Sequence, residues 1–260
     1  MSPYLILGIA VAAALASPLG GLISLWLAPT TLFMSLALGF ASGVLFATIS
    51  FEMLPQALEA GSLLVAVGGF AGGFLAVYGL DLFINRGRIA GEKAEQRDFV
   101  RRFHRRHRPR GDQVTVLAGG TSVEELIEGL SIGVGAAIEP HLGLMVGAAV
   151  VVDNVAEALS IGELIRDESR KDGGRPVRRV LKWTGLIGAS LLGSALIGWF
   201  ALRGLPDPLL GFLFALGGGG MFYLTVTDLV PESEKRQYQQ SAALAIGAGF
   251  VMMLALGHVR

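Results

Sequence analysis

Two related stretches decide the fold of this chain: EELIEGLSIG at residues 124–133 and DNVAEALSIG at residues 153–162. Each begins with two polar side chains, places a glutamate at its fifth position and ends in Leu-Ser-Ile-Gly. On a helix of 3.6 residues per turn, positions one, two and five fall within an arc of about 100°. Each stretch therefore presents three polar side chains on one helix face, and the two faces can meet if the helices pack side by side.

Composition places the rest of the chain in a membrane. Hydrophobic residues make up 52% and charged residues 16% of the 260 residues, and the mean hydropathy is +0.59, whereas soluble domains carry about 25% charged residues. The 21 basic and 21 acidic residues cancel, so net charge identifies no partner. The absence of cysteine excludes disulfides, thiolate nucleophiles and Cys-ligated metal centres.

The apolar residues are gathered into segments of membrane-spanning length. A helix needs roughly 20 mostly apolar residues to cross about 30 Å of hydrocarbon. Eight segments satisfy this requirement, so we expect an all-α polytopic membrane protein with a single transmembrane domain over residues 1–260. No basic region or cleavage site precedes the first segment, which indicates an uncleaved helix. The predicted spans are about 4–27, 32–57, 61–84, 114–138, 142–165, 180–202, 209–231 and 238–258.

Nearly all lysines and arginines fall in three of the connecting loops. They are the ten between residues 86 and 110, the seven between 166 and 182, and Lys235 and Arg236. These loops share one side of the membrane, and only Arg203 and Arg260 lie on the other. Because basic loops remain cytoplasmic, we expect a multi-pass protein of the cell membrane with both termini outside and a cytoplasmic basic loop at 86–112.

The arginine-rich stretch at residues 101–110 also contains His104 and His107. Its charge could attract nucleic acid or anionic lipid, but the orientation of the chain accounts for these bases without a ligand. The neighbouring arginines also repel a metal cation from the two histidines. We therefore predict no nucleic-acid partner and no metal site in this loop.

A second pair of related stretches reinforces the first. Glu52-Met-Leu-Pro55, at the end of the second span, matches Asp228-Leu-Val-Pro231, at the end of the seventh. In both pairs the partners lie in spans that run in opposite directions, which is typical of transporters with inverted repeats. We predict three helices, a central pair and three more helices, related by a pseudo-two-fold axis in the membrane plane.

The central pair of spans carries five carboxylates and one amide near the bilayer midplane. They are Glu124, Glu125, Glu128, Asp153, Asn154 and Glu157. An acid at that depth costs about 2.5 to 3.5 kcal/mol on insertion scales, and serine or asparagine could join the helices at lower cost. No base lies at that depth, so the acids need divalent cations, protons or both as counter-charge. An oxygen-only cluster suits one or two divalent metal ions.

On these residues the chain resembles the Zrt/Irt-like (ZIP) family of divalent metal transporters over essentially its whole length. That family carries His-Asn-x-x-Glu-Gly in span 4 and His-(Glu/Asn/Asp)-x-x-Glu-Gly in span 5. The matching positions are Glu124, Glu125, Glu128 and Gly129, then Asp153, Asn154, Glu157 and Ala158. Residues 43–55 and 219–232 are similar to the family's span 2 ending and span 7. The resemblance implies eight spans with both ends outside, a 3+2+3 arrangement, and Zn, Fe, Mn, Co or Cd as the transported ion, bound at the matched positions and moved into the cytoplasm.

The departures from the family pattern that matter most are at its two motif histidines. Both motif histidines are replaced by carboxylates, Glu124 and Asp153. Imidazole favours zinc, whereas carboxylate and amide oxygens suit Mn and Mg and tolerate Fe(II); zinc also accepts carboxylate oxygens. We therefore expect Mn or Fe(II) to compete at least as well as zinc.

Glu52, Asp228 and Glu232 are candidate residues of the transport pathway. At about 1.5 Å per residue, Glu52 is predicted near the outer surface and Asp228 near the cytoplasmic surface. Each of these two acids precedes a proline by three residues, and proline loosens a helix where it lines a polar cavity. The alternative is that these acids merely end their helices, because charges near span ends cost little.

Buried acids also occur in intramembrane proteases, but the other features of such an enzyme are missing. Glu124-Glu125 is followed at position 129 by glycine rather than a base, no His-Glu-x-x-His is present, and Tyr78-Gly-Leu-Asp81 lacks a second aspartate motif. We predict a transporter rather than an enzyme. The alternatives are a proton-driven carrier of another cation and a metal-sensing receptor. The glycine-rich helix faces allow a homodimer in the lipid bilayer.

Overall fold

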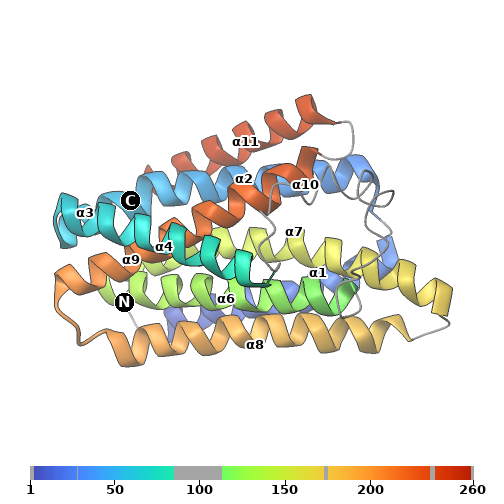
Figure 1. Cartoon of the computed structure of the whole chain (residues 1–260), viewed down its shortest axis with the longest axis horizontal. Coiled ribbons are helices and arrows are strands. Elements are labelled where there is room, and N and C mark those ends of the chain that lie inside the picture. The colour runs from blue at the N-terminus through green and yellow to red at the C-terminus, as the bar shows by residue number, and fades with distance from the viewer. Residues whose placement is uncertain (1–2, 28, 85–112, 173–174, 235–237, 259–260) are drawn as a thin grey trace.

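The computed structural model describes residues 3–27, 29–84, 113–172, 175–234 and 238–258. Over these residues the chain forms helices and no strand (Figure 1). The helices are α1 (Pro3–Leu27), α2 (Thr31–Thr48), η1 (Ile49–Met53), α3 (Leu54–Ala60), α4 (Leu63–Ile84), α6 (Gln113–Ile138), α7 (Pro140–Asp172), α8 (Pro176–Leu202), α9 (Asp207–Leu224), η2 (Thr225–Leu229), α10 (Val230–Glu234) and α11 (Gln239–His258).

Seven helical segments of the described chain are long and apolar enough to cross a membrane. Two are composite: α2, η1 and α3 run continuously from Thr31 to Ala60, and α9, η2 and α10 run from Asp207 to Glu234. Helix α6 has 26 residues, but every 18-residue window within it contains the three glutamates of the first repeated stretch. Helix α6 is therefore long enough to cross a membrane, and it differs from the other seven segments in its three acidic residues. The predicted all-α polytopic membrane fold is confirmed.

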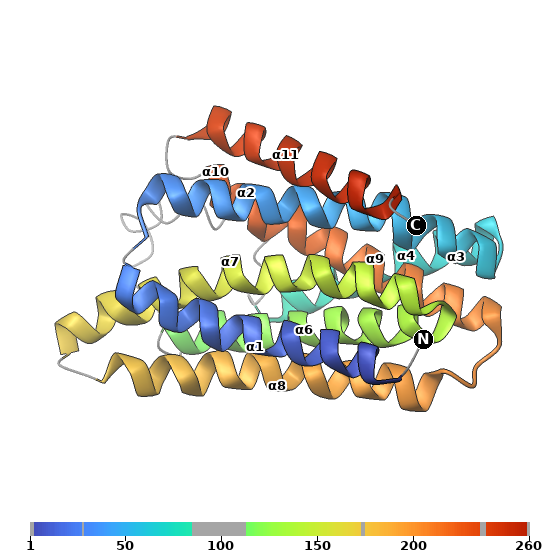
Figure 2. The same ribbon diagram turned by 180° about the vertical axis from the view of Figure 1, so that it is seen from behind.

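Successive spans run in opposite directions, so the connections lie at two ends of the bundle. Both chain ends lie at the terminus end (Figure 2), with the turns that follow α3, α6 and α8. The opposite end, named the basic end, receives the C-terminal ends of α4, α7 and α10. The described bases from Arg166 to Lys182 lie at this basic end.

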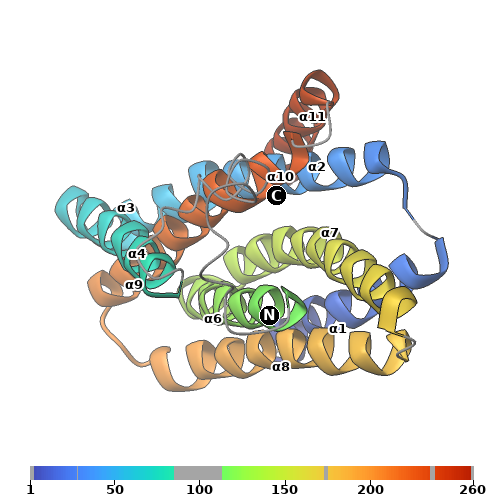
Figure 3. The ribbon, with the colours of Figure 1, turned by 45° about the vertical axis from the view of Figure 1, so that its right-hand side comes forward.

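The spans form two groups of four (Figure 3). The site bundle consists of α1, α6, α7 and α8, in which α1 and α6 each pack on both α7 and α8. The flanking bundle consists of the two composite segments with α4 and α11, and in it α2 packs on α11 and α4 on α9. The two bundles touch mainly where α2 meets α7 and where α6 meets α9. The central helices α6 and α7 therefore lie at the boundary between the bundles.

Close helix contacts repeat with inverted symmetry. A Cβ on Gly43 of α2 would collide with the Ile246 carbonyl oxygen of α11, and a Cβ on Gly219 of α9 would collide with the Phe70 carbonyl oxygen of α4. Gly219 lies 176 residues after Gly43, and Ile246 lies 176 residues after Phe70, so the two contacts occupy equivalent positions of the repeat. The closely packed pair α1–α7 likewise corresponds to the closely packed pair α8–α6. The described helices thus follow the predicted 3+2+3 inverted repeat.

A π-helical turn interrupts each composite segment, η1 in one and η2 in the other. Each turn is closed by an amide-to-carbonyl hydrogen bond that spans five residues, such as Leu54 N to Ile49 O. Pro55 and Pro231 each follow the end of a turn after one intervening residue. Proline lacks an amide hydrogen and its ring crowds the carbonyl four residues earlier, so a wider turn before it relieves that crowding.

Candidate metal site between the central helices

The glycine that ends each repeated stretch fixes a central helix against its neighbour. A Cβ on Gly133 of α6 would lie 2.7 Å from the Trp199 backbone nitrogen of α8, and a Cβ on Gly162 of α7 would lie 2.6 Å from the Gly21 carbonyl oxygen of α1. Only glycine permits contacts this close. On a helix these glycines lie roughly 130° from the centre of the polar face, so their packing turns the polar faces of α6 and α7 away from α8 and α1.

The two predicted triplets of polar side chains meet. Asn154 Nδ2 donates a hydrogen bond of 3.3 Å to Glu125 Oε2, and the carboxyl groups of Glu128 and Asp153 share a hydrogen bond. Both contacts join α7 to α6. Glu124 and Glu157 are partly exposed, whereas the other four are almost completely buried. Their exposed fractions are 1% for Glu125, 5% for Glu128, 2% for Asp153 and 1% for Asn154.

The electrostatic environment of the cluster is uniformly acidic. Among the described residues, the charged groups that act on Glu125, Glu128, Asp153 and Glu157 are all carboxylates. Such a set is stable in a low-dielectric interior only with protons or cations to balance it. The hydrogen bond between Glu128 and Asp153 itself requires a proton, because two ionised carboxylates have no donor.

Three oxygens of the cluster are buried without a hydrogen-bond partner in the described part of the chain. They are Glu125 Oε1, Asp153 Oδ1 and Asn154 Oδ1. Buried polar atoms are normally satisfied, and carboxylate and amide oxygens are donors for hard divalent cations. No three His, Asp or Glu side chains of the described residues already converge as a ready-made metal site. A metal ion would therefore have to displace one of the contacts between α6 and α7.

The predicted pathway residues Glu52 and Asp228 lie in the two π-helical turns, η1 and η2. Helix continues beyond both turns. The charge of Asp228 acts on Glu157, so Asp228 lies within electrostatic reach of the cluster. The Glu52 carboxylate lies against Gly257 of α11, where a Cβ would collide with Oε1. Helices α3 and α10 extend beyond the predicted span ends at residues 57 and 231, and the depths of the two acids relative to the membrane surfaces stay predictions.

Glu232 lies on α10 and is partly buried. The carbonyl of the next residue, Ser233, accepts a 2.6 Å hydrogen bond from Ser35 Oγ of α2. This bond anchors α10 to α2 and places Glu232 within the flanking bundle, at the basic end of the interface between the composite segments.

Three further residues support the cluster and were not anticipated from the sequence. Ser194 of α8 donates a 3.2 Å hydrogen bond to the backbone oxygen of Glu125, and Ala13 of α1 accepts one of 3.2 Å from Asn154 Nδ2. Ser160 lies three residues beyond the α7 glutamate, on the polar face of that helix. Its hydroxyl is buried and has no partner among the described residues. Because both repeated stretches end in Leu-Ser-Ile-Gly, the repeat itself could have identified Ser160 as a candidate.

The matching serine of α6 behaves differently. Ser131 Oγ donates a 2.8 Å hydrogen bond to Ile127 O within α6 and lies against Gly217 of α9. The two serines occupy equivalent repeat positions on opposite sides of the cluster, Ser131 toward the terminus end and Ser160 toward the basic end. The hydroxyl of Ser131, on the terminus side, is therefore hydrogen-bonded and packed, whereas that of Ser160, on the basic side, has no partner among the described residues.

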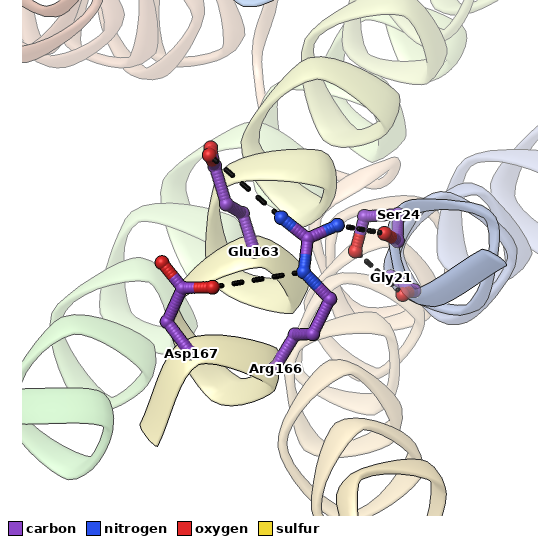
Figure 4. Close-up of polar contacts among 5 residues, drawn as sticks. All are labelled: Gly21, Ser24, Glu163, Arg166 and Asp167. Atoms are coloured by element: carbon purple, nitrogen blue, oxygen red, sulfur yellow. Dashed lines mark hydrogen bonds and ion pairs between the residues drawn. The ribbon is translucent and has the colours of Figure 1, made fainter. Parts of the chain in front are cut away.

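Below the cluster, toward the basic end, a paired arginine connects α7 to α1 (Figure 4). Arg166 Nη1 donates a 3.0 Å hydrogen bond to Ser24 O, and Ser24 Oγ donates one of 2.9 Å to Gly21 O. Glu163 lies 4.0 Å and Asp167 3.7 Å from the guanidinium nitrogens. The arginine charge is thus balanced by its own helix neighbours, and the bond to Ser24 holds the end of α1 on α7.

These features together define a polytopic cation transporter: an inverted-repeat helical bundle whose central helices bury a cluster of carboxylates that no base of the described residues balances. The description of the family model that matches residues 91–257 is "ZIP Zinc transporter", and the chain belongs to this ZIP family. It is therefore a divalent metal transporter and not an enzyme.

Relatives with known assignments extend the match to most of the chain. The zinc transporter ZupT of Corynebacterium glutamicum is 28% identical over 95% of both chains. The ZupT of Corynebacterium efficiens is 25% identical over 93% of this chain and 91% of its own. The ZupT of Salmonella paratyphi A is 26% identical over 86% of this chain and 84% of its own. The predicted resemblance to the ZIP family is confirmed.

Proposed function

We propose that the chain moves a divalent metal ion through the cluster between α6 and α7 into the cytoplasm. The observation that best supports this route is the set of unpaired buried oxygens on Glu125, Asp153 and Asn154, beside a hydrogen-bonded carboxyl pair. A divalent cation would satisfy these oxygens and balance the surrounding carboxylates at once. Ser194 and Ala13 would position Glu125 and Asn154 for this role.

The proposed ligands are the six polar side chains of the repeated stretches. They are Glu124, Glu125, Glu128, Asp153, Asn154 and Glu157. Binding of one or two ions would break the contact between Asn154 and Glu125 and would displace the proton that the carboxyl pair shares. Each step exchanges a hydrogen bond for a metal–oxygen bond, so the ion can also leave again when the original contacts re-form.

The ion carried is proposed to be Zn, Fe, Mn, Co or Cd. The relatives named zinc transporters support zinc, and zinc accepts carboxylate oxygens. The donor set of Glu124 and Asp153 in place of imidazoles supports Mn and Fe(II). We therefore propose a broad divalent specificity in which zinc has no advantage over these two metals.

Access to the cluster is proposed to alternate through movement of the site bundle against the flanking bundle. The cluster lies where the bundles meet, and Asp228 of the flanking bundle acts on Glu157 of the site bundle. Asp228 would receive the ion on the basic side, with Glu232 beyond it. Glu52, in the equivalent π-helical turn, would guide ions on the terminus side. The π-helical turns would supply the flexibility that such movement needs.

The basic end is proposed to face the cytoplasm of the cell and the terminus end the outside, as the distribution of bases favours. A homodimer would form through the face of α4 that carries Gly68 and Gly72. A Cβ at either position would meet nothing within 4 Å, so a second copy could approach this face closely.

The test is uptake of Zn, Mn, Fe(II), Co, Cd and Mg by the purified protein in liposomes. Glu128→Gln and Glu157→Gln should each abolish uptake while leaving the protein folded. Glu139→Gln is the matched control, because Glu139 is exposed in the turn between the same two helices. Wild-type uptake in either cluster variant, with normal insertion, would show that the ion does not pass through the cluster.

A second candidate, proton-coupled transport, is supported by the hydrogen bond between Glu128 and Asp153. If the entering metal displaces the shared proton, uptake should alter the pH inside liposomes that contain a pH-sensitive dye. Asp153→Asn should then uncouple the pH change from any residual metal flux. A constant internal pH during wild-type uptake would favour facilitated diffusion.

A further inference from the structure

The bases of α7 and α8 at the basic end fall into two classes. Arg166 is balanced by acids of its own helix (Figure 4), and Arg179 Nη2 lies 2.7 Å from Glu168 Oε2. By contrast, Arg175, Arg178 and Lys182 are exposed and make no ion pair with any described residue. The structure therefore leaves three positive charges of α8 available to a ligand.

These three bases gather at the N-terminal end of α8. Arg178 and Lys182, four residues apart, lie within an arc of about 40° on the helix, and Arg175 caps the helix directly before its first turn. They are named the α8 basic face. Because Arg178 and Lys182 belong to the first two turns of α8, their relative positions are fixed by the helix, and Arg175 adjoins them at its N-cap.

The distance along α8 between its two ends indicates that these bases lie at the level of the lipid headgroups. At the terminus end, the Arg203 guanidinium lies 5.9 Å from the centre of the Trp199 ring, an arrangement typical of an interfacial anchor. Lys182 precedes Arg203 by a rise of about 31 Å, close to the hydrocarbon thickness. Lys182 therefore lies at the opposite membrane surface, and Arg178 and Arg175 lie about 6 Å and 10 Å further out, among the headgroups.

An open apolar groove adjoins the same bases. It has a volume of about 570 Å³ and is lined by Arg175, Pro176, Val177, Arg178 and Leu181. Val177 is 47% and Leu181 45% exposed, so apolar surface begins directly beside the two arginines. A soluble anion would use only the charges. A phospholipid would use both the charges and the apolar surface.

We propose that the α8 basic face binds an anionic phospholipid. The guanidinium groups of Arg175 and Arg178 would hold the phosphate and its second anionic group through charge-assisted hydrogen bonds. Lys182 would add charge at the hydrocarbon boundary, and an acyl chain would lie along Val177 and Leu181. A zwitterionic lipid brings a positive group that the three bases repel. The site belongs to the bundle that carries the metal cluster, but the argument depends neither on the metal nor on the direction of transport.

The test is native mass spectrometry of the purified protein in detergent, titrated with phosphatidylglycerol or phosphatidylcholine. Arg175→Gln and Arg178→Gln should each weaken phosphatidylglycerol binding about fivefold, as expected for the loss of one base at an anionic surface. Arg178→Lys should retain most of the affinity. Arg170→Gln is the matched control, because Arg170 is exposed at the same end of the bundle on α7 and outside the groove.

The proposal is supported if the two glutamine variants bind phosphatidylglycerol more weakly than wild type and the control. It is overturned if all variants bind it equally, or if wild type binds phosphatidylcholine as tightly as phosphatidylglycerol. Retention of metal uptake in liposomes shows that each variant is folded. Since uptake tests the metal route separately, failure of the lipid site would leave the proposed transport route unaffected.

Discussion

Replacing Gly162 by alanine tests how closely α7 must approach α1. The added Cβ would lie 2.6 Å from the Gly21 carbonyl oxygen and would collide with the Ser24 hydroxyl. The hydroxyl can rotate away only by giving up its 2.9 Å hydrogen bond to Gly21 O. The carbonyl belongs to the backbone and can move only if α1 moves. The substitution therefore forces the two helices apart by about 0.5 Å, because ordinary contacts of this kind begin near 3.2 Å.

The energetic cost combines three contributions. Overpacking costs about 1–3 kcal/mol, and the lost hydrogen bond costs about 1 kcal/mol. The greater helix propensity of alanine returns about 0.5–1 kcal/mol. A net loss of about 1–3 kcal/mol corresponds to a decrease in melting temperature of about 3–10 °C for a chain of this size.

Thermal unfolding of the purified protein in detergent measures this effect. Gly185→Ala is the control, because a Cβ at Gly185 of α8 would meet nothing within 4 Å, and that variant should melt at or slightly above the wild-type temperature. Metal uptake below the melting temperature should also fall in Gly162→Ala, since separating α1 from α7 disturbs the polar face of α7. If Gly162→Ala melts with the control, close packing of α1 on α7 does not fix the central helix.

Three further predictions concern transport in liposomes. Mn and Fe(II) should compete with labelled zinc at least as well as unlabelled zinc does, and Glu124→His combined with Asp153→His should shift the ranking toward zinc; an unchanged ranking would mean that these ligands do not set selectivity. Glu52→Ala should raise the half-saturating metal concentration, whereas Asp228→Ala, within electrostatic reach of the cluster, should mainly lower the maximal rate; wild-type values for both would exclude them from the pathway. Because the chain lacks cysteine, Ser160→Cys can be labelled specifically, and a membrane-impermeant thiol reagent should modify it from the basic end faster than the same substitution at the α6 serine.

The sequence was sufficient for the fold class and for the meeting of the two triplets. Apolar length and basic loops identify spans, and the spacing of Glu128 and Asp153 with their neighbours places acids on facing surfaces. Both inferences rest on local periodicity. The π-helical turns leave no comparable trace, because hydropathy does not distinguish five residues of wider helix from the turns around them. For that reason the sequence did not place Glu52 and Asp228 in π-helical turns, and the helices around them extend further than the apolar segments suggest.

Contacts between distant helices were equally inaccessible from spacing alone. Asn154 reaches both Glu125 and the Ala13 carbonyl, and nothing in the sequence connects α1 to the acids of α7. The pairing of Arg166 with Ser24 depends on the approach of two helices that Gly162 permits. From the sequence, all lysines and arginines of the basic end were explained by the orientation of the chain in the membrane. Only the structure separates those that have acidic partners from those that remain available.

An inverted repeat that was perfectly symmetric would give the two sides of the cluster equal chemistry, so the departures from symmetry are what distinguish them. On the terminus side, Ser131 is engaged in its own helix and packs against α9, and Glu52 is turned toward α11. On the basic side, the Ser160 hydroxyl has no partner within the described part of the chain, and the charge of Asp228 acts on Glu157 of the cluster. Polar groups therefore continue from the cluster toward the basic end, while helix packing separates the cluster from the terminus end. Because Ser131 corresponds to Ser160 and Glu52 to Asp228 under the repeat, we expect the proposed movement of one bundle against the other to exchange these roles between the two sides.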